Sequence, residues 1–192
     1  VIKGGVTAAN GFQAAGLSAG IKKGNTKDMA MIYSIVPCKA AGTFTTNVVK
    51  AAPVKWDKEV VYHSSAAQAV ICNSGIANAC TGEEGFGYCK KTAEIAAEVL
   101  GIPADSVLVA STGVIGKQLP MDKIEAGIRS MAPVLSPAGS AGTLAAEAIM
   151  TTDTVKKEIA VEVEIGGKKV TLGGMCKGSG MIHINMGTML GF

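Results

Sequence analysis

The 192-residue chain carries 18 basic and 15 acidic side chains, which gives a net charge of only +3. It has neither a basic cluster interleaved with aromatic residues nor an apolar run near the ~18 residues of a membrane span, which argues against a nucleic-acid partner and against a membrane protein. Hydrophobic residues make up 48% and aromatic residues only 4%, which predicts a core of small aliphatic side chains. No signal-peptide pattern is present, and we expect a cytoplasmic protein.

Cysteine and histidine do not form a metal-binding or disulfide pattern. The cysteine count is odd and there is no C-x-x-C pair, so we expect reduced thiols, no disulfide framework and no zinc site. Of the two histidines, His63 is interpreted as a surface residue. For His183 we favour a passive loop position, with contact to a reactive site as the alternative. The five cysteines are Cys38, Cys72, Cys80, Cys89 and Cys176.

The first two thirds of the chain predict strands alternating with helical segments. Buried strands are expected over Met29–Val36 and Ala67–Asn73, because both runs are apolar and short. Apolar residues then recur every three or four positions over Tyr88–Leu100, which predicts a helix that ends at Gly101. A third strand is expected over Ser106–Ser111. This order of elements predicts a mixed α/β fold.

The last third predicts two more helices and a hairpin. Pro120 opens a helix, since its missing N–H is tolerated in the first turn. The Ser130–Gly142 segment is the expected loop, and Leu144–Met150 is a short helix. Apolar and polar residues alternate over Ile159–Ile165, and the Gly-Gly pair that follows predicts a two-residue turn into a second strand. No interdomain linker is visible.

The segment Lys177–Phe192, KGSGMIHINMGTMLGF, contains a Gly187–Thr188 step that suits one specific chemistry. If the bond before Thr188 is cut, the freed amine of this residue can act as the base for its own hydroxyl. A threonine hydroxyl is a poor nucleophile without such a base. Taken alone, a threonine after a glycine is more simply interpreted as an ordinary loop or strand residue than as a nucleophile.

A second candidate motif, Ser111–Gly116, reads STGVIG at the carboxyl end of the expected third strand. Backbone amides held at such a turn can stabilise an oxyanion. Thr112 offers a hydroxyl, and Gly113 offers an amide with no side chain to obstruct a substrate. Alone, this pattern is weak, because most such turns only reverse the chain.

Taken together, seven sequence blocks resemble those of the ornithine acetyltransferase family (glutamate N-acetyltransferase), in the family's order and over essentially the whole chain. At the junction this sequence has Ile184 and Gly187 where the family usually has proline and alanine. The blocks are GVTAANGFQAAGLSAGIK, DMAMIYS, AAGTFTTNVVKAAPV, NSGIANACTG, VLVASTGVIGKQLPMDKI, AAEAIMTTDT and KGSGMI.

The resemblance implies a role for each candidate residue. Thr188 would be the nucleophile after self-cleavage between Gly187 and Thr188. Thr112 and Gly113 would form the oxyanion hole. Thr151 and Lys177, together with Thr188, would bind the substrate.

Two of these positions have simpler readings from sequence alone. Lys177 reads as a solvated lysine in a glycine loop. Thr151 reads as a helix terminator, and Asp153 as the N-cap of whatever follows.

The resemblance also implies a reaction and an assembly. Acetyl transfer from N-acetylornithine to glutamate would proceed by a ping-pong route through an acetyl-Thr188 ester, without a cofactor. Residues 1–187 would be an α segment forming one domain, and residues 188–192 the start of a β segment, in a heterotetramer of two α and two β chains. The implied fold is a layered α/β architecture of the N-terminal-nucleophile-like type, with mixed sheets and flanking helices.

Two rival functions remain open from sequence. A self-cleaving N-terminal-threonine amidase or aminopeptidase would share the junction and the oxyanion hole but deliver the acyl group to water. A binding or scaffold protein that has lost self-cleavage would keep the fold without the chemistry. Acetyl-CoA is expected to be an optional acetyl donor, because the sequence has no phosphate-binding glycine loop.

Overall fold

The computed structural model describes residues 1–180 and 188–192. Within these residues the chain forms a four-stranded sheet of order β1-β2-β3-β4 and a three-stranded sheet of order β5-β6-β7. The strands are β1 (Phe12–Leu17), β2 (Met29–Cys38), β3 (Ala67–Ile76), β4 (Val107–Val114), β5 (Lys157–Ile165), β6 (Lys168–Lys177) and β7 (Leu190–Gly191). The helices are α1 (Ala52–His63), α2 (Gly82–Leu100), α3 (Met121–Met131) and α4 (Gly139–Ala148), with short 3₁₀ turns at Ala104–Ser106 and Ala132–Val134.

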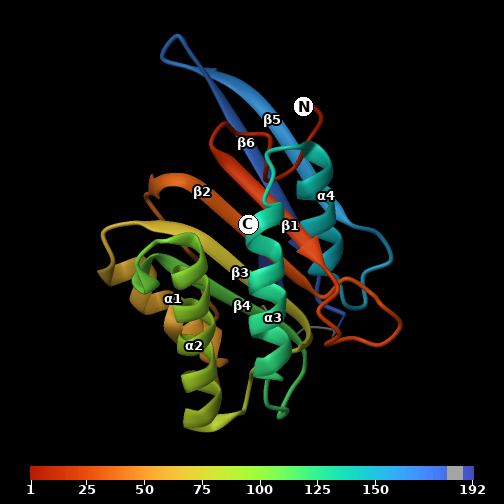
Figure 1. The fold of residues 1–192 in the computed structure, drawn as a ribbon. Coiled ribbons are helices and arrows are strands. Elements are labelled where there is room, and N and C mark those ends of the chain that lie inside the picture. The colour runs from red at the N-terminus through yellow and green to blue at the C-terminus, as the bar shows by residue number, and fades with distance from the viewer. Residues whose placement is uncertain (181–187) are drawn as a thin grey trace.

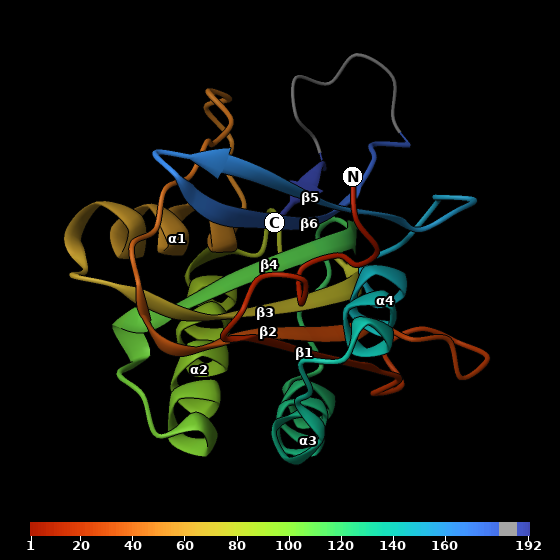
Figure 2. The ribbon, with the colours of Figure 1, turned by 90° about the horizontal axis from the view of Figure 1, so that it is seen from above.

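The four-stranded sheet lies in the middle of the molecule. α2 and α3 cover one face, whereas α4 and the three-stranded sheet lie on the other (Figure 1, Figure 2). β1–β2 and β2–β3 are antiparallel, and β3–β4 are parallel, with α2 in the connection between them. α1 packs against β4, which is one edge of this sheet. The architecture is therefore the layered α/β fold expected from the sequence.

Alternation along the central strands produces two cores. On β4, Val107 and Val109 join the core beneath α2 and α3, whereas Ala110 joins the core beneath α4. Met175 of β6 contributes to the second core, which links the two sheets. Successive side chains of a strand point to opposite faces, so the buried apolar runs of the sequence serve both cores at once.

Most predicted elements are confirmed. The three predicted strands are β2, β3 and β4, and the predicted hairpin is β5–β6. Gly166 and Gly167 at its turn have φ of 58° and 72°, the left-handed values that a two-residue turn of this kind requires.

The predicted start of the helix α4 was wrong. α4 begins at Gly139, inside the segment Ser130–Gly142 expected to be a loop. Gly142 lies against the second core, where a Cβ would come within 2.9 Å of the Thr7 Oγ1. On the facing strand, a Cβ at Gly16 would overlap the Leu144 carbonyl. Close packing of the helix on β1 thus outweighs the low helix propensity of glycine.

The sequence patterns also missed β1, α1 and the first turns of α2. α2 begins at Gly82 rather than Tyr88, through a stretch rich in glycine. Gly85 is buried there, and a Cβ would overlap the Thr81 side chain, so this turn depends on close packing rather than propensity. Among the residues that the structure describes, no helix combines the length and apolar character needed to cross a membrane.

Candidate active site

Thr112 lies within β4 rather than in a turn after it. The strand was expected to end at Ser111, but it continues to Val114, with Thr112 in register with Ser74 of β3. Thr112 is only 2% exposed. It follows Ala110 by two positions, so its side chain points to the same face of the sheet, toward α4 and the three-stranded sheet.

Gly113 is required by the packing of the two strand ends. Its φ is +132°, and a Cβ here would overlap the backbone of Gly75, its partner in register. Val114 and Ile115 beyond it are 59% and 55% exposed. Gly113 therefore marks the point where β4 leaves the core and opens to solvent.

The carboxyl end of α4 lies over the same strands. The Ser74 hydroxyl, in register with Thr112, donates to the Ala148 carbonyl at 2.5 Å. The Lys22 Nζ donates to the Met150 carbonyl at 2.7 Å. These contacts hold the segment that carries Thr151, itself exposed, on the side of the sheet to which Thr112 points.

Lys22 was not singled out from the sequence. A Cβ at Gly75 would lie 3.2 Å from the Lys22 Cγ, so this side chain runs past the paired glycines of β3 and β4. Burial lowers its pKa, and the Asp28 carboxylate opposes that shift. Asp28, fully buried, accepts hydrogen bonds from the backbone N–H groups of Ala19, Ile21 and Lys22 at 2.6–2.9 Å. A lysine in a Gly-rich surface loop carries no sequence signal for such a position.

Lys177 is a buried strand residue, so the interpretation as a solvated loop lysine was wrong. It is 2% exposed, and it pairs in register with Leu190 of β7. Its Nζ donates to the carbonyls of Gly178 at 2.6 Å and Thr188 at 3.0 Å. Burial lowers the pKa of the ammonium, and nearby Asp153 opposes the shift. The structure thus places a buried cation directly against the backbone of Thr188.

Asp153 joins two of the candidate segments. Its carboxylate accepts hydrogen bonds from the Gly178 N–H at 2.9 Å, the Lys157 Nζ at 2.6 Å and, more weakly, the Thr151 N–H at 3.4 Å. Its side chain is 3% exposed. Burial raises its pKa, but these hydrogen bonds outweigh that effect and lower the pKa to about 2. The expectation of a helix N-cap was wrong, because the next element is β5.

The site residues therefore form two linked groups. Lys177 contacts Thr188, and Asp153 connects their neighbourhood to Thr151. Thr112 and Gly113 lie with the carboxyl end of α4, on the facing sheet. The cleavage-site residue Gly187, together with Ile184 and His183, lies outside the described residues.

The histidine and cysteine residues that the structure describes add no further group to this site. His63 is on the surface as expected, with its side chain 71% exposed and its Nε2 3.6 Å from Glu59. All five cysteines are free thiols, and burial raises the pKa of Cys72 and Cys89. In the described part of the chain, no three His, Cys, Asp or Glu side chains gather in a way that could hold a metal ion.

A family model described as the ArgJ family matches residues 13–192. The chain belongs to the ArgJ family. The resemblance to ornithine acetyltransferases noted in the sequence is therefore confirmed.

Curated members of the ArgJ family match the whole chain but extend well beyond it. The arginine biosynthesis bifunctional protein ArgJ of Symbiobacterium thermophilum is 56% identical over 100% of this chain and 47% of its own length. The protein of the same name from Thermosynechococcus vestitus is 50% identical, over 100% of this chain and 45% of its own length. The chain thus spans about half the length of the curated relatives it matches.

Two crystal structures of ArgJ family members share the fold. Arginine biosynthesis bifunctional protein ArgJ from Bacillus halodurans has a TM-score of 0.90 and 43% identity, covering 97% of this chain and 95% of that chain. An ornithine acetyltransferase from Mycobacterium tuberculosis, complexed with ornithine, has a TM-score of 0.87 and 43% identity, covering 97% and 96%. The matched crystal chains are thus similar in extent to this one.

Proposed function

We propose that the complete protein is an ornithine acetyltransferase, which moves the acetyl group of N-acetylornithine to glutamate in arginine biosynthesis. The observation that carries the proposal is the hydrogen bond from the buried Lys177 Nζ to the Thr188 carbonyl, 3.0 Å long. It joins the proposed nucleophile to a cation suited to a substrate carboxylate. The names of the relatives, which are bifunctional proteins of arginine biosynthesis, support the same conclusion.

The proposed reaction has two half-reactions on Thr188. Once the bond to Gly187 is cut, the free amine of Thr188 takes the proton of its hydroxyl as that oxygen attacks the acetyl carbonyl. The tetrahedral intermediate collapses to an acetyl-threonine ester, and ornithine leaves with the proton on its amine. The amine of glutamate then attacks the ester, which returns the free hydroxyl and yields N-acetylglutamate.

Thr112 and Gly113 act as the oxyanion donors in this proposal. Both lie at the end of β4. The Thr112 side chain points to the face that carries α4, and Gly113 has no side chain to block an approaching carbonyl. A donor at such a position typically contributes about 2.7–4 kcal/mol to the transition state. The Lys177 ammonium has three N–H bonds. Two of them reach described carbonyls, and the third is assigned to the substrate carboxylate.

Self-cleavage before Thr188 divides the proposed precursor into an α segment, residues 1–187, and a β segment beginning at Thr188. Support comes from the relatives: the two matched crystal chains are about as long as this chain, whereas the curated relatives are about twice as long. The two segments form one catalytic unit, paired further into a heterotetramer of two α and two β chains. The substrates enter as free small molecules, and acetyl-CoA is an optional donor.

The test uses the complete protein and its Thr188→Ala and Thr188→Ser variants. Denaturing mass spectrometry should give two chains for the parent and one for Thr188→Ala, because the alanine variant lacks the attacking hydroxyl. Thr188→Ser should still cleave, since it retains both the hydroxyl and the amine. Cleavage of Thr188→Ala at the same bond would show that another protease cuts the chain and would remove Thr188 as the nucleophile.

The acetyl acceptor is tested on the cleaved parent with N-acetylornithine and glutamate. The expected product is N-acetylglutamate in an amount equal to the ornithine released. Release of acetate without N-acetylglutamate would assign the protein to the amidases instead. Comparable turnover with acetyl-CoA and with N-acetylornithine would contradict the secondary role of acetyl-CoA.

A further inference from the structure

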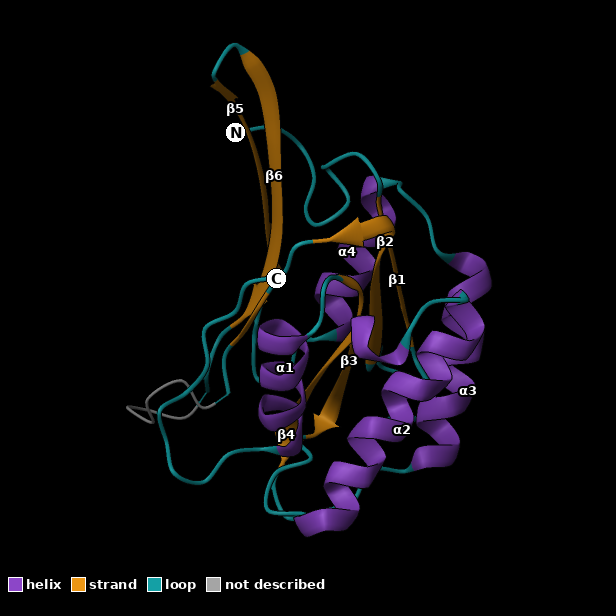
Figure 3. Ribbon diagram, turned by 90° about the vertical axis from the view of Figure 1, so that its left-hand side faces the viewer, coloured by secondary structure: helices purple, strands orange, loops and turns teal. Residues whose placement is uncertain are grey.

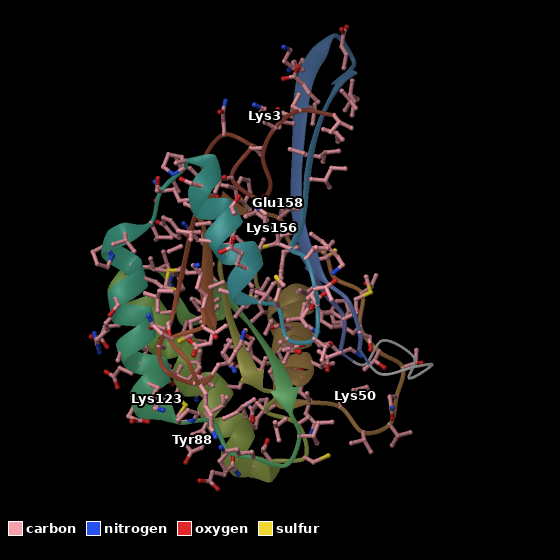
Figure 4. The ribbon with its side chains drawn as sticks, turned by 90° about the vertical axis from the view of Figure 1, so that its right-hand side faces the viewer. Lys3, Lys50, Tyr88, Lys123, Lys156 and Glu158 are labelled. Atoms are coloured by element: carbon pink, nitrogen blue, oxygen red, sulfur yellow. The ribbon has the colours of Figure 1, made fainter. Side chains whose placement is uncertain are left out.

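The hairpin β5–β6 extends away from the body of the molecule (Figure 1, Figure 3). At its base, Glu158 accepts hydrogen bonds from the Thr143 hydroxyl of α4 at 2.8 Å and from the Lys156 Nζ at 2.9 Å (Figure 4). Toward the tip, none of the described residues forms such a layer behind the hairpin (Figure 3). The two faces of the hairpin differ in the side chains that they carry.

One face of this hairpin is apolar and uncovered among the described residues. Ile159, Ile165 and Leu172 are 57%, 62% and 56% exposed. The opposite face carries the alternating glutamates of β5, of which Glu162 pairs with Lys169 at 3.0 Å. Such alternation is typical of a strand with one buried face. We call the apolar side the outer face; its residues are Ile159, Val161, Val163, Ile165, Val170 and Leu172.

Among the described residues, the backbone of β6 also has no partner along most of one edge. β5 pairs with β6 from Lys168 to Cys176 on one side, whereas on the other side β7 pairs with Cys176 and Lys177. Met175 adds two hydrogen bonds with Phe192, its N–H and its carbonyl each at 2.9 Å. Because such bonds alternate along an antiparallel strand, Lys169, Thr171 and Gly173 direct their N–H and carbonyl groups toward this free edge.

The chain of β7 runs toward that free edge. Leu190 lies opposite Lys177, Gly191 opposite Cys176, and Phe192 is hydrogen-bonded to Met175. A residue following Phe192 in the same direction would fall opposite Gly174. About seven residues would reach Lys168 at the tip, given one residue per strand position.

We propose that the segment following Phe192 continues β7 along the free edge of β6, and that the remainder of that segment packs on the outer face. The inference rests on the part of the proposed function that assigns a second segment to the protein; the length of the relatives supports that segment. An exposed apolar hairpin with an open edge is otherwise a site of aggregation, which folded proteins cover or block. Continuity with β7 selects this segment over an unrelated partner or a second copy of the hairpin.

Backbone amide exchange on the complete protein is the first test. The amides of Val170 and Leu172 bond to β5 and serve as internal references. If the edge is paired, the amides of Lys169, Thr171 and Gly173 should exchange about a hundredfold more slowly than in an unstructured peptide, as the references do. Fast exchange at these three amides beside slow exchange at the references would overturn the proposal.

The outer face is tested with Leu172→Glu, and Thr171→Glu is the matched control. The two positions are adjacent, but Thr171 points to the opposite face of the hairpin. Leu172→Glu should weaken the association of the two segments at least tenfold, because the new carboxylate would have to be buried. Thr171→Glu should change it less than threefold. Equal effects of the two variants would show that the outer face is not part of the interface. If Leu172→Glu does not fold, amide exchange on the parent still tests whether the edge of β6 is paired.

Repeating the exchange experiment on the uncut Thr188→Ala precursor separates this proposal from the proposed reaction. Pairing along β6 does not require cleavage, so the three amides should remain protected there. If the three amides are protected but the parent shows neither cleavage nor acetyl transfer, the pairing along β6 is supported and the proposed function is contradicted. If the parent transfers acetyl groups but the three amides exchange fast, the proposed function is supported and the pairing along β6 is contradicted.

Discussion

Gly113 and Gly116 lie three residues apart at the end of β4, but their surroundings differ. Both have positive φ, +132° and +78°. A Cβ at Gly113 would overlap the backbone of Gly75, whereas a Cβ at Gly116 would meet nothing within 4 Å. Packing therefore requires glycine at position 113, independently of any role in oxyanion binding.

These two glycines give a prediction at the residue scale. Gly113→Ala should lower the free energy of unfolding by about 3 kcal/mol or more, since backbone strain and overlap with β3 add together. Gly116→Ala should lower it by only about 1–2 kcal/mol, the strain of the left-handed conformation alone. Urea unfolding of the two variants measures both values. Equal losses would mean that β3 and β4 separate easily at Gly75.

α1 illustrates, at the scale of elements, how an edge strand is protected. The Trp56 Nε1 donates to the Val107 carbonyl at 2.8 Å, and the Asp57 carboxylate accepts from the Val109 N–H at 2.8 Å. Both backbone groups belong to β4, the edge of the central sheet. The helix therefore supplies the hydrogen bonds that another strand would otherwise make.

Asp57 makes this edge sensitive to pH. Burial raises the pKa of its carboxyl from 3.8 to about 7, although the hydrogen bond from Val109 opposes the shift. Between these two values the folded state holds a proton that the unfolded state has released. Stability should therefore fall as the pH rises from about 4 to about 7, by up to roughly 1.4 kcal/mol per pH unit.

Asp57→Asn should abolish this slope, because asparagine retains the acceptor for Val109 and does not ionise. Unfolding free energies of parent and variant at several pH values provide the measurement. The variant should be the more stable protein at pH 7 and lose most of that advantage near pH 4. A constant difference across this range would show that Asp57 does not titrate between the two states.

At the scale of the whole molecule, the candidate site is assembled from both sheets. Thr112 comes from the central sheet, and Thr151 follows α4. Lys177 belongs to β6 of the three-stranded sheet, and Thr188 lies two residues before β7. Asp153 is the connection that the structure reveals, because its carboxylate accepts from the backbone beside both Thr151 and Lys177. We expect it to position these segments rather than to contact the substrate.

Asp153→Asn tests that positioning role. Loss of the charged hydrogen bonds should lower the free energy of unfolding by roughly 1.5–3 kcal/mol. It should also raise the KM for N-acetylornithine more than it lowers kcat, because the segments proposed to bind the substrate would loosen. Glu162→Gln, which removes an exposed ion pair with Lys169, is the control and should cost less than about 1 kcal/mol. An unchanged KM would leave Asp153 as a structural residue only.

The same carboxylate contributes to acid stability. Its pKa is lowered to about 2 in the folded protein, from an ordinary value of 3.8. The stability it contributes is therefore complete above about pH 4 and is lost as the pH falls toward 2. The Asn variant should lack this part of the acid dependence.

Sequence by itself determined the family, the three central strands, the hairpin and the candidate residues, because each depends on local patterns or on blocks of consecutive residues. Tertiary structure alone decided whether Lys177 is solvated or buried, that Asp153 bonds to the backbone beside Thr151 and Lys177, and that α4 begins at Gly139. Burial and hydrogen bonding between residues distant in the chain leave no period in the sequence. Propensity likewise fails where close packing, as between α4 and β1, outweighs the intrinsic preference of glycine.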